Sequence, residues 1–112
     1  MLQKVAPILP AISLSETNLF YKNKLKFLTH YYGNYLIVIK EGIEIHFVEC
    51  RDPTKFIASS CCIFDNNIED LFAKCCSMDM IRPGGNLKDN SRGKKEFCIV
   101  DNNGNELRFC EW

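Results

Sequence analysis

Short segments in which apolar and polar residues alternate predict β-strands in the first half of this chain. The earliest segment contains two prolines and suits the edge of a sheet, because proline has no N–H to donate to a neighbouring strand. Turn dipeptides that contain glycine separate the later segments, as is typical of hairpins. The four predicted strands cover residues 5–12, 26–31, 35–40 and 43–49.

A helix is expected between the first and second of these strands. Ser13 and Glu16 have the spacing of a capping box, in which two side chains satisfy free N–H groups at the start of a helix. The helix should extend to about Leu25 and bury leucine and aromatic side chains. The first half of the chain is therefore predicted to have the order βαβββ.

The same order of elements starts again after a linker at about residues 51–56. Asn66 and Glu69 offer a second capping box, and apolar residues at i, i+3, i+4 and i+7 predict an amphipathic helix after it. A polar, glycine-rich loop over residues 83–93 precedes a hairpin with a strong turn signal at 101–104. The predicted strands of this half are 57–64, 78–81, 96–100 and 105–111.

An internal repeat links the two halves. Residues 35–49 align without a gap with residues 97–111, and six of the fifteen aligned positions are identical. The repeat predicts a single α+β domain over residues 1–112, built of two tandem βαβββ modules with pseudo-twofold symmetry. Module one covers about residues 5–50 and module two about 57–112, and together they are expected to form a curved mixed sheet around a shared cleft.

The alternation within the repeat also assigns side chains to faces of the sheet. The apolar residues should pack beneath the helices, because a sheet buries one face to stabilise the fold; these are Ile43, Ile45, Phe47, Leu107 and Phe109. The polar residues between them should face the cleft; these are Glu44, His46, Glu106 and Arg108. His46 and Arg108 are equivalent positions of the repeat, so we expect them in comparable places in the cleft.

The composition limits the classes of function. With 46% hydrophobic and 12% aromatic residues, the chain can form a substantial core. The net charge is zero and no five like charges are adjacent, which is untypical of nucleic-acid binding. No apolar run reaches the roughly 18 residues of a membrane span, and residues 1–10 do not have the pattern of a secretory signal. We therefore expect a soluble, cytoplasmic protein with neither nucleic acid nor membrane as partner.

Seven cysteines are a high count for this length, and no two of them form a C-x-x-C pair. We expect reduced thiols that pack as small apolar groups, with Cys75 on the buried side of its helix. The neighbours Cys61 and Cys62 should point to opposite faces of a strand. A thiol sensor based on Cys61 or Cys110 is the alternative, although only a cross-strand contact with Arg108 could activate either thiol.

Several short segments, in their order and spacing, are similar to those of one known family. They are Leu9-Pro10, Phe20-Tyr21 before Leu25-Lys26-Phe27, Glu44-Ile45-His46-Phe47, Ser60-Cys61-Cys62-Ile63, Ile68-Glu69-Asp70-Leu71-Phe72, Gly93 with Glu96-Phe97, and Asp101-Asn102-Asn103-Gly104-Asn105 through Leu107-Arg108-Phe109. By these segments the chain resembles the vicinal oxygen chelate superfamily, which is built from paired βαβββ modules. Within it, the chain is most similar to the bleomycin-resistance, glyoxalase-like branch, over essentially its whole length.

The resemblance implies where a metal would bind. Metal enzymes of the superfamily use four ligands, usually His or Gln on the first strand of each module and Glu on the last. The matching positions here lie near Ala6 or Pro7, at His46, at Ser59 or Ser60, and at Arg108. Only His46 could be a ligand, because an arginine has no lone pair to offer and a catalytic ion typically needs about three protein ligands. We therefore expect neither a metal nor another cofactor.

The resemblance further implies a non-enzymatic protein that sequesters a small molecule in metal-free clefts. Two subunits of a homodimer would build these clefts together, with or without an exchanged first strand. Tyrosines near the turn at residues 33–34 could stack on a planar ligand. Arg92 stands where the family commonly has a tryptophan, so the ligand is either a bleomycin-type glycopeptide or an anionic small molecule. The expected ligand-binding residues are Tyr31, Tyr32, Tyr35, His46, Arg92 and Arg108.

A small glyoxalase-like lyase or transferase is the alternative function. His46 would then be the general base, polarised by Glu44 or Glu106, since a histidine titrates near neutral pH. Arg108 would stabilise a developing oxyanion. The competing structural interpretation of His46 is a histidine whose hydrogen bonds are satisfied within the sheet.

Overall fold

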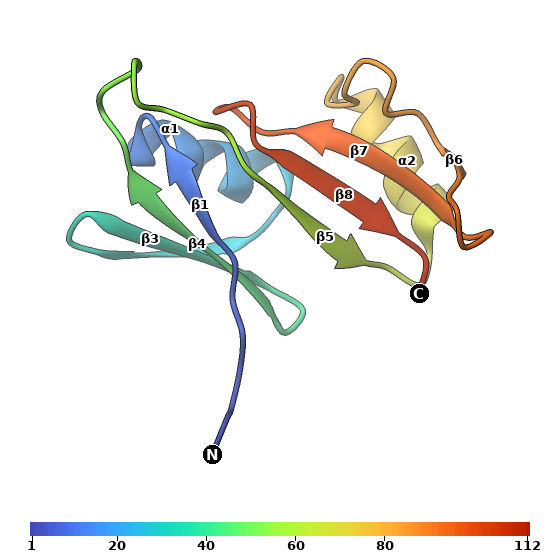
Figure 1. Ribbon diagram of the computed structural model, residues 1–112, viewed down its shortest axis with the longest axis horizontal. Helices are drawn as coiled ribbons and strands as arrows, with labels where there is room; N and C mark the ends of the chain where they lie inside the picture. The colour runs from blue at the N-terminus through green and yellow to red at the C-terminus, as the bar shows by residue number, and fades with distance from the viewer. The chain divides into compact units, whose positions relative to one another are not determined.

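The computed structural model describes residues 1–112, which form two compact units, Met1–Ser59 and Ser60–Trp112. The order of elements along the chain can be followed by colour in Figure 1. The first unit contains β1 (Ile8–Ala11), α1 (Leu14–Leu19), the π-helical turn η1 (Phe20–Lys24), β2 (Leu28–Tyr32), β3 (Tyr35–Lys40) and β4 (Ile43–Glu49). The second contains β5 (Ser60–Phe64), α2 (Ile68–Ser77), β6 (Lys88–Asp89), β7 (Lys95–Val100) and β8 (Glu106–Cys110).

The order βαβββ is confirmed in both units, so the α+β class with two tandem modules is correct. In each module the first strand pairs in parallel with the last, and the remaining pairs are antiparallel. The strand orders are β1-β4-β3-β2 and β5-β8-β7-β6. The hydrogen bonds thus define two four-stranded mixed sheets, one in each unit, where the sequence predicted one curved sheet.

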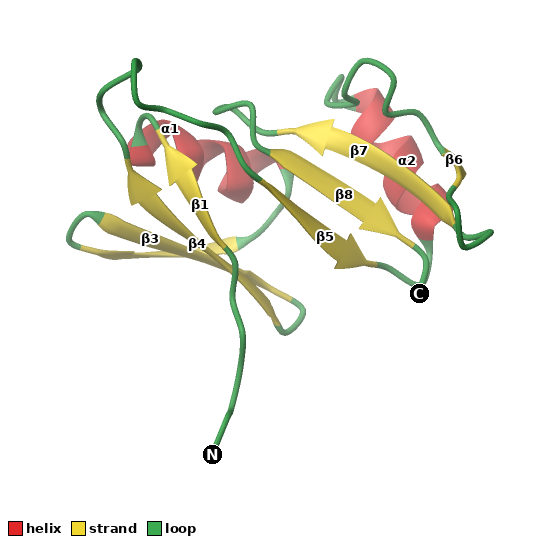
Figure 2. Cartoon of the chain, in the orientation of Figure 1, coloured by secondary structure: helices red, strands yellow, loops and turns green.

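In each unit the helical segment packs on one face of the sheet, as Figure 2 shows. Ile45 and Phe47 of the first sheet are 1% and 0% exposed, as their alternation predicted, whereas Ile43, at the start of β4, is 37% exposed and does not join the core. Tyr21 of η1 is also fully buried, and its ring centroid lies 4.9 Å from that of Phe47 and 5.7 Å from that of Phe27. Aromatic contacts of this kind stabilise a core by about 0.5–1.5 kcal/mol beyond their burial. One face of the first sheet is therefore closed by the core.

The start of α1 agrees with the sequence. The Ser13 hydroxyl accepts a hydrogen bond from the backbone N–H of Glu16 at 3.3 Å, which satisfies one of the free donors of the first turn. At Phe20 the α-helix gives way to η1, so the helical segment ends at Lys24, beside the predicted end at Leu25. No helix in the structure has the length and apolar character needed to cross a membrane.

The predicted cap of α2 is wrong by one residue. The N-cap is Asn67 rather than Asn66, and its side chain makes no capping bond to the backbone. Instead, the Asn67 amide group donates to the Asp70 carboxylate at 2.8 Å, and the Asn67 backbone N–H donates to the Asp65 carboxylate at 2.6 Å. Because Asp65 already turns the chain through this local bond, the helix begins one residue later than the capping box suggested.

The predicted strand at 78–81 is also wrong. The backbone N–H groups of Met78, Asp79 and Met80 donate to carbonyls of Cys75 and Cys76, which continues the last turn of α2. Asp79 has φ of 55°, a left-handed conformation that closes a helix rather than extends a strand. Only residue 81 forms a bridge, to residue 99, and the short strand β6 supplies the second strand of this module instead.

The repeat is displaced by one residue within its hairpins. In the structure Leu36 lies opposite Phe47, and Phe97 lies opposite Phe109, the repeat equivalent of Phe47. Leu36 therefore corresponds to Phe97, whereas the alignment without a gap matches it with Cys98. With the corrected match, Leu36 and Phe97 are both buried. The register of the hydrogen bonds decides between the two matches, because Cys98 is buried as well.

The cause is a longer turn in the second hairpin. The first closes through Glu41 and Gly42, both with positive φ, which is the two-residue turn that best matches strand twist. The second closes through residues 102–104, one residue more, between Asp101 and Asn105, where the Asp101 N–H donates to the Asn105 carbonyl at 2.9 Å. There the buried Asp101 carboxylate accepts from the N–H groups of Asn103 and Asn105, at 2.8 and 2.9 Å. This local network makes the longer turn a stable unit of its own.

Candidate functional site

The face of the first sheet that is opposite the core carries a chain of polar contacts, which we call the Tyr35 relay. The Tyr35 hydroxyl lies 2.6 Å from Nδ1 of His46, and Nε2 of His46 lies 2.6 Å from the Glu44 carboxylate. The ammonium group of Lys4 donates to the other oxygen of Glu44 at 2.5 Å. Since a carboxylate only accepts, Nε2 of His46 donates to Glu44, and in the tautomer with a single proton on Nε2 the Nδ1 atom accepts a hydrogen bond from the Tyr35 hydroxyl. Both ring nitrogens of His46 are thus engaged.

The relay also sets the charge of Glu44. Hydrogen bonds from Lys4 and then from His46 hold the pKa of the Glu44 carboxyl below its usual 4.5. Opposite charges and donors near a carboxyl favour its ionised form. Glu44 is consequently a carboxylate at neutral pH, and it orients the imidazole. Of the two partners proposed for His46, the structure places Glu44 in contact with it.

The three tyrosines near the first hairpin turn do not share one face. Tyr32 lies directly opposite Tyr35 in the β2–β3 pair, so the two side chains are on the same face. Tyr31 lies opposite the buried Leu36 and is therefore on the core face, where its hydroxyl donates to the carbonyl of Leu14 at 3.3 Å. Of the three, only Tyr32 and Tyr35 share a face with His46, and only Tyr35 contacts it.

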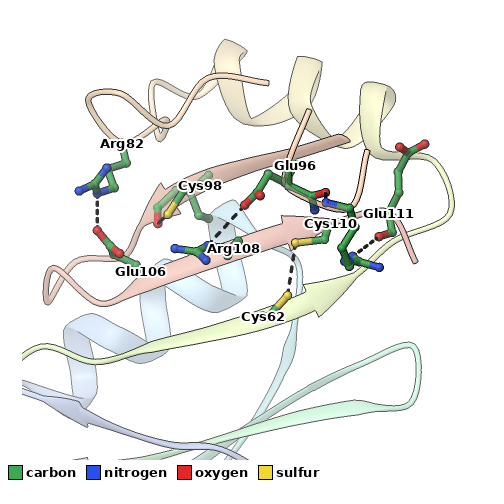
Figure 3. Close-up of polar contacts among 11 residues, drawn as sticks. Cys62, Arg82, Glu96, Cys98, Glu106, Arg108, Cys110 and Glu111 are labelled. Carbon is green, nitrogen blue, oxygen red and sulfur yellow. Dashed lines mark hydrogen bonds and ion pairs between the residues drawn. The ribbon is translucent and has the colours of Figure 1, made fainter. Parts of the chain in front are cut away.

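The corresponding face of the second sheet carries a small charged pocket, which we call the Arg108 pocket. Nε of Arg108 lies 3.5 Å from the Glu96 carboxylate, and Arg82 forms an ion pair with Glu106 (Figure 3). The pocket has a volume of about 100 Å³. Its lining residues are Arg82, Gly84, Gly85, Lys88, Glu96, Phe97, Cys98, Glu106 and Arg108.

One wall of this pocket is a tight turn over residues 82–85, at the start of the predicted glycine-rich loop. The backbone N–H of Arg82 donates to the carbonyl of Cys98, and the N–H of Cys98 donates to the carbonyl of Gly85, both at 2.9 Å. The N–H of Gly85 donates to the carbonyl of Arg82 at 2.7 Å. A side chain at Gly85 would place its Cβ 2.7 Å from the Cys98 oxygen, so glycine is required for this close approach. The turn fastens Arg82 to the sheet beside Glu106.

Sequence reasoning missed Arg82 and Lys88 as candidate site residues. Both lie in or beside the segment that was assigned only as a polar, glycine-rich loop. The available signal was Gly84-Gly85, since paired glycines mark a backbone that approaches another segment closely. Which strand the loop approaches is a tertiary contact, and no local pattern encodes it.

Arg92 lies apart from the lining of the Arg108 pocket. Its guanidinium donates to the carbonyl of Glu111 at 3.0 Å and lies over the rings of Phe64 and Trp112, at 5.9 and 5.8 Å from their centroids. Phe64 and Trp112 contact each other edge to face with centroids 4.9 Å apart. An arginine between two aromatic rings is held by cation–π attraction. The family's tryptophan position is thus occupied here by an arginine that contacts two aromatic side chains.

The cysteines are free thiols, as the sequence predicted, and two of them are in contact. Sγ of Cys62 lies 3.3 Å from Sγ of Cys110, between the parallel strands β5 and β8 (Figure 3). Burial and then the neighbouring Cys62 raise the pKa of Cys110 to about 12, and burial raises the pKa of Cys61 to about 11. Neither thiol is activated, which disfavours the sensor hypothesis.

The positions that match the superfamily's metal ligands do not form a donor set. His46 engages both nitrogens in the Tyr35 relay, and Arg108 pairs with Glu96. No group of three or more His, Cys, Asp or Glu side chains that could hold a metal ion occurs in the structure. The residues present therefore do not fit a catalytic divalent ion, which typically needs about three protein ligands.

Comparison with known proteins gives both sequence and structural relatives, although no protein-family model matches the chain. Bleomycin resistance proteins of Geobacillus stearothermophilus and Staphylococcus aureus are 26% identical over an alignment 127 positions long, gaps included, which covers 97% of this chain and 96% of theirs. The bleomycin resistance determinant encoded on transposon Tn5 has a TM-score of 0.82 at 19% identity, with 98% of both chains covered.

Two further solved structures share the fold. A bleomycin-binding protein in complex with bleomycin has a TM-score of 0.79 at 18% identity, with 99% of both chains covered. A lactoylglutathione lyase from Agrobacterium tumefaciens has a TM-score of 0.79 at 11% identity, with 97% of this chain and 92% of the other covered.

The chain has the fold of the glyoxalase and bleomycin-resistance class, with one βαβββ module in each unit. Its similarity to bleomycin resistance proteins covers nearly the whole chain. The resemblance seen in the sequence is therefore confirmed as a likeness: the chain is similar in sequence to bleomycin resistance proteins and shares the fold of the solved bleomycin-resistance and glyoxalase structures.

Proposed function

We propose that this protein binds a small molecule and sequesters it without changing it chemically, as a metal-free, drug-binding protein of the bleomycin-resistance type. The observation that carries the proposal is the similarity to bleomycin resistance proteins over 97% of the chain. The engaged state of His46 supports it, because a histidine with both nitrogens hydrogen-bonded within the protein has no free nitrogen to accept a substrate proton.

The proposal includes a homodimer whose two subunits complete each cleft. The ligand-facing residues are proposed to be Tyr32, Tyr35, His46 and Arg108, with Tyr31 and Arg92 toward the margins of the site. Tyr31 takes this outer role because it lies on the core face of the first sheet, and Arg92 because it lies outside the lining of the Arg108 pocket. A cytoplasmic location is also proposed, since seven free thiols suit a reducing compartment.

Isothermal titration of the reduced protein tests the binding function. Bleomycin and phleomycin, each metal-free and copper-loaded, are titrated separately, and one ligand per subunit with micromolar or tighter affinity is expected. Tyr32→Ala should weaken binding, because it removes an exposed aromatic surface. An aromatic-to-alanine control at Phe20 of η1 is unsuitable, because Phe20 contacts Tyr21 of the core. Lys74→Gln on α2 is the matched surface control. Absence of heat with all four ligands would overturn the proposal for bleomycin-type drugs.

A second experiment tests the dimer. Sedimentation at micromolar concentration is expected to give twice the chain mass of 12.9 kDa. A stable monomer that still binds ligand with full affinity would contradict the shared cleft.

A glyoxalase-like lyase is the second candidate, and the contact between Glu44 and His46 favours it. In that case the Glu44 carboxylate would polarise the imidazole, and His46 would act as the general base, accepting a substrate proton at Nδ1 in place of the hydrogen bond from Tyr35. Turnover of dicarbonyl–thiol adducts that is lost in His46→Gln would support this enzyme, and its absence at high protein concentration would remove it.

A further inference from the structure

We propose that the Arg108 pocket binds one small oxyanion group, a carboxylate or a phosphate. The group would belong to the ligand held under the proposed function, on which this assignment rests. It specifies one chemical group of that ligand, an anionic one.

The first argument is charge. Three cationic side chains and two carboxylates line the pocket. The carboxylates are used within the protein, Glu106 by Arg82 and Glu96 by Arg108. Lys88 makes no side-chain hydrogen bond or ion pair, although it lies directly opposite Glu96 in the β6–β7 pair. The pocket therefore retains an uncompensated positive charge at Lys88.

The second argument is the set of free donors. Arg108 contacts Glu96 through Nε, so its two terminal nitrogens remain available, and its side chain is 57% exposed. A guanidinium edge with two parallel N–H groups matches the two oxygens of a carboxylate or phosphate. Together with the three N–H donors of Lys88, Arg108 can surround one oxyanion.

The third argument is rigidity. The backbone bonds between the turn at Gly85 and strand β7 fix one wall of the pocket, and Glu106 fixes Arg82 against it. A charged group that is already oriented loses little conformational freedom when an anion binds. The two internal ion pairs therefore orient the guanidinium groups of Arg82 and Arg108 for an anion, in addition to neutralising part of their charge.

The fourth argument is size. The pocket volume is about 100 Å³, whereas sites for whole drug-sized ligands measure about 300–1,000 Å³. The Arg108 pocket therefore accommodates one functional group of a ligand and not a complete glycopeptide. A cationic group would be repelled from the same place by the uncompensated charge of Lys88.

Amide NMR titration with inorganic phosphate, and separately with acetate, at constant ionic strength tests the assignment. The amides of Gly84 and Gly85 and the Nε–H groups of Arg82 and Arg108 should shift together and saturate. Lys88→Gln should weaken binding about tenfold, because it removes a charge-assisted hydrogen bond. Lys94→Gln, an exposed lysine outside the pocket with the same change of charge, should leave the affinity unchanged. A stronger response to phosphate or to acetate identifies the preferred anion.

Several outcomes would overturn the assignment. Shifts that spread over many lysine-rich segments without saturating indicate only nonspecific attraction of anions. If Lys88→Gln and Lys94→Gln weaken anion binding equally, the attraction is likewise nonspecific. Retained binding in Arg108→Gln, checked for folding by its amide spectrum, would exclude the guanidinium as an anchor.

The titrations with bleomycin and with the two anions together distinguish this inference from the proposed function. If bleomycin binds while phosphate and acetate do not, the drug-binding proposal stands and the anion assignment fails. If the anions bind at the pocket while bleomycin gives no heat, the assignment stands and the bleomycin-type ligand is excluded. If neither binds, both are wrong.

Discussion

Replacement of Gly85 by alanine tests whether the turn at residues 82–85 determines the Arg108 pocket. The new Cβ would lie 2.7 Å from the Cys98 oxygen and 3.0 Å from the Arg82 oxygen, both backbone atoms that cannot rotate away. The turn must therefore move off β7, and the hydrogen bonds that join Arg82 and Gly85 to Cys98 must lengthen.

Two opposing effects determine how much Gly85→Ala lowers the free energy of unfolding. Overpacking of a close backbone contact typically costs about 1–3 kcal/mol, and alanine returns about 0.4–1 kcal/mol by restricting the unfolded chain. A net loss of about 1–2 kcal/mol remains, which lowers the urea midpoint by about 0.5–1 M when m is about 2 kcal/mol/M. Urea unfolding followed by circular dichroism measures this shift.

Hydrogen exchange provides the specific readout. The N–H of Cys98 is bonded to the Gly85 carbonyl, so its exchange should accelerate in Gly85→Ala by more than the loss of global stability explains. Gly84→Ala is the matched control: Gly84 has φ of 78° but its Cβ would contact only the tip of Arg82 at 3.9 Å. That variant should be destabilised through backbone strain without selective opening at Cys98. An unchanged midpoint and unchanged Cys98 exchange in Gly85→Ala would refute the close approach.

Three further predictions concern the Tyr35 relay and the thiols. Glu44 has a lowered folded pKa, so its contribution to stability is present above about pH 4.5 and is lost as the pH falls through that lowered pKa; Glu44→Gln should flatten the acid limb of stability, measured as urea midpoints from pH 6 to 3, and an unaltered limb would contradict this. Tyr35→Phe should cost about 1 kcal/mol by removing the hydrogen bond to His46, whereas Tyr32→Phe should cost almost nothing, and equal midpoints for the two would be a contrary result. Cys61 and Cys110, with pKa values of about 11 and about 12, should be alkylated by iodoacetamide at pH 8 much more slowly in the folded than in the unfolded protein, as mass mapping would show; comparable rates would disprove the raised pKa.

The sequence contained enough information to find the module order and the buried faces. Alternation identified Ile45 and Phe47 as core residues, because a strand exposes successive side chains to opposite sides whatever the rest of the fold does. The contact between Tyr35 and His46 also follows from the sequence. A two-residue turn at residues 41–42 fixes Tyr35 opposite Val48, so His46 is its diagonal neighbour on the same face.

Other parts of the candidate site depended on contacts that no local pattern encodes. The contact between Cys62 and Cys110 requires the register of the parallel pair β5–β8, whose strands are distant in sequence and share no turn. The position of Arg82 requires the turn at Gly85 to dock on β7. The strand predicted at 78–81 failed because apolar residues at the end of a helix have the same local composition as a short strand.

The one-residue difference between the two hairpin turns has a consequence for how the two halves could diverge after duplication. A residue gained or lost within a turn leaves every side chain of the two flanking strands on its own face of the sheet. The same change inside a strand would move the side chains on one side of the insertion to the opposite face. The internally bonded turn at Asp101 absorbs such a change, since its carboxylate satisfies the additional backbone N–H groups. Historical insertions should therefore be placed at these turns when distant relatives are aligned, and an alignment that forbids a gap there exchanges core and surface residues along an entire strand.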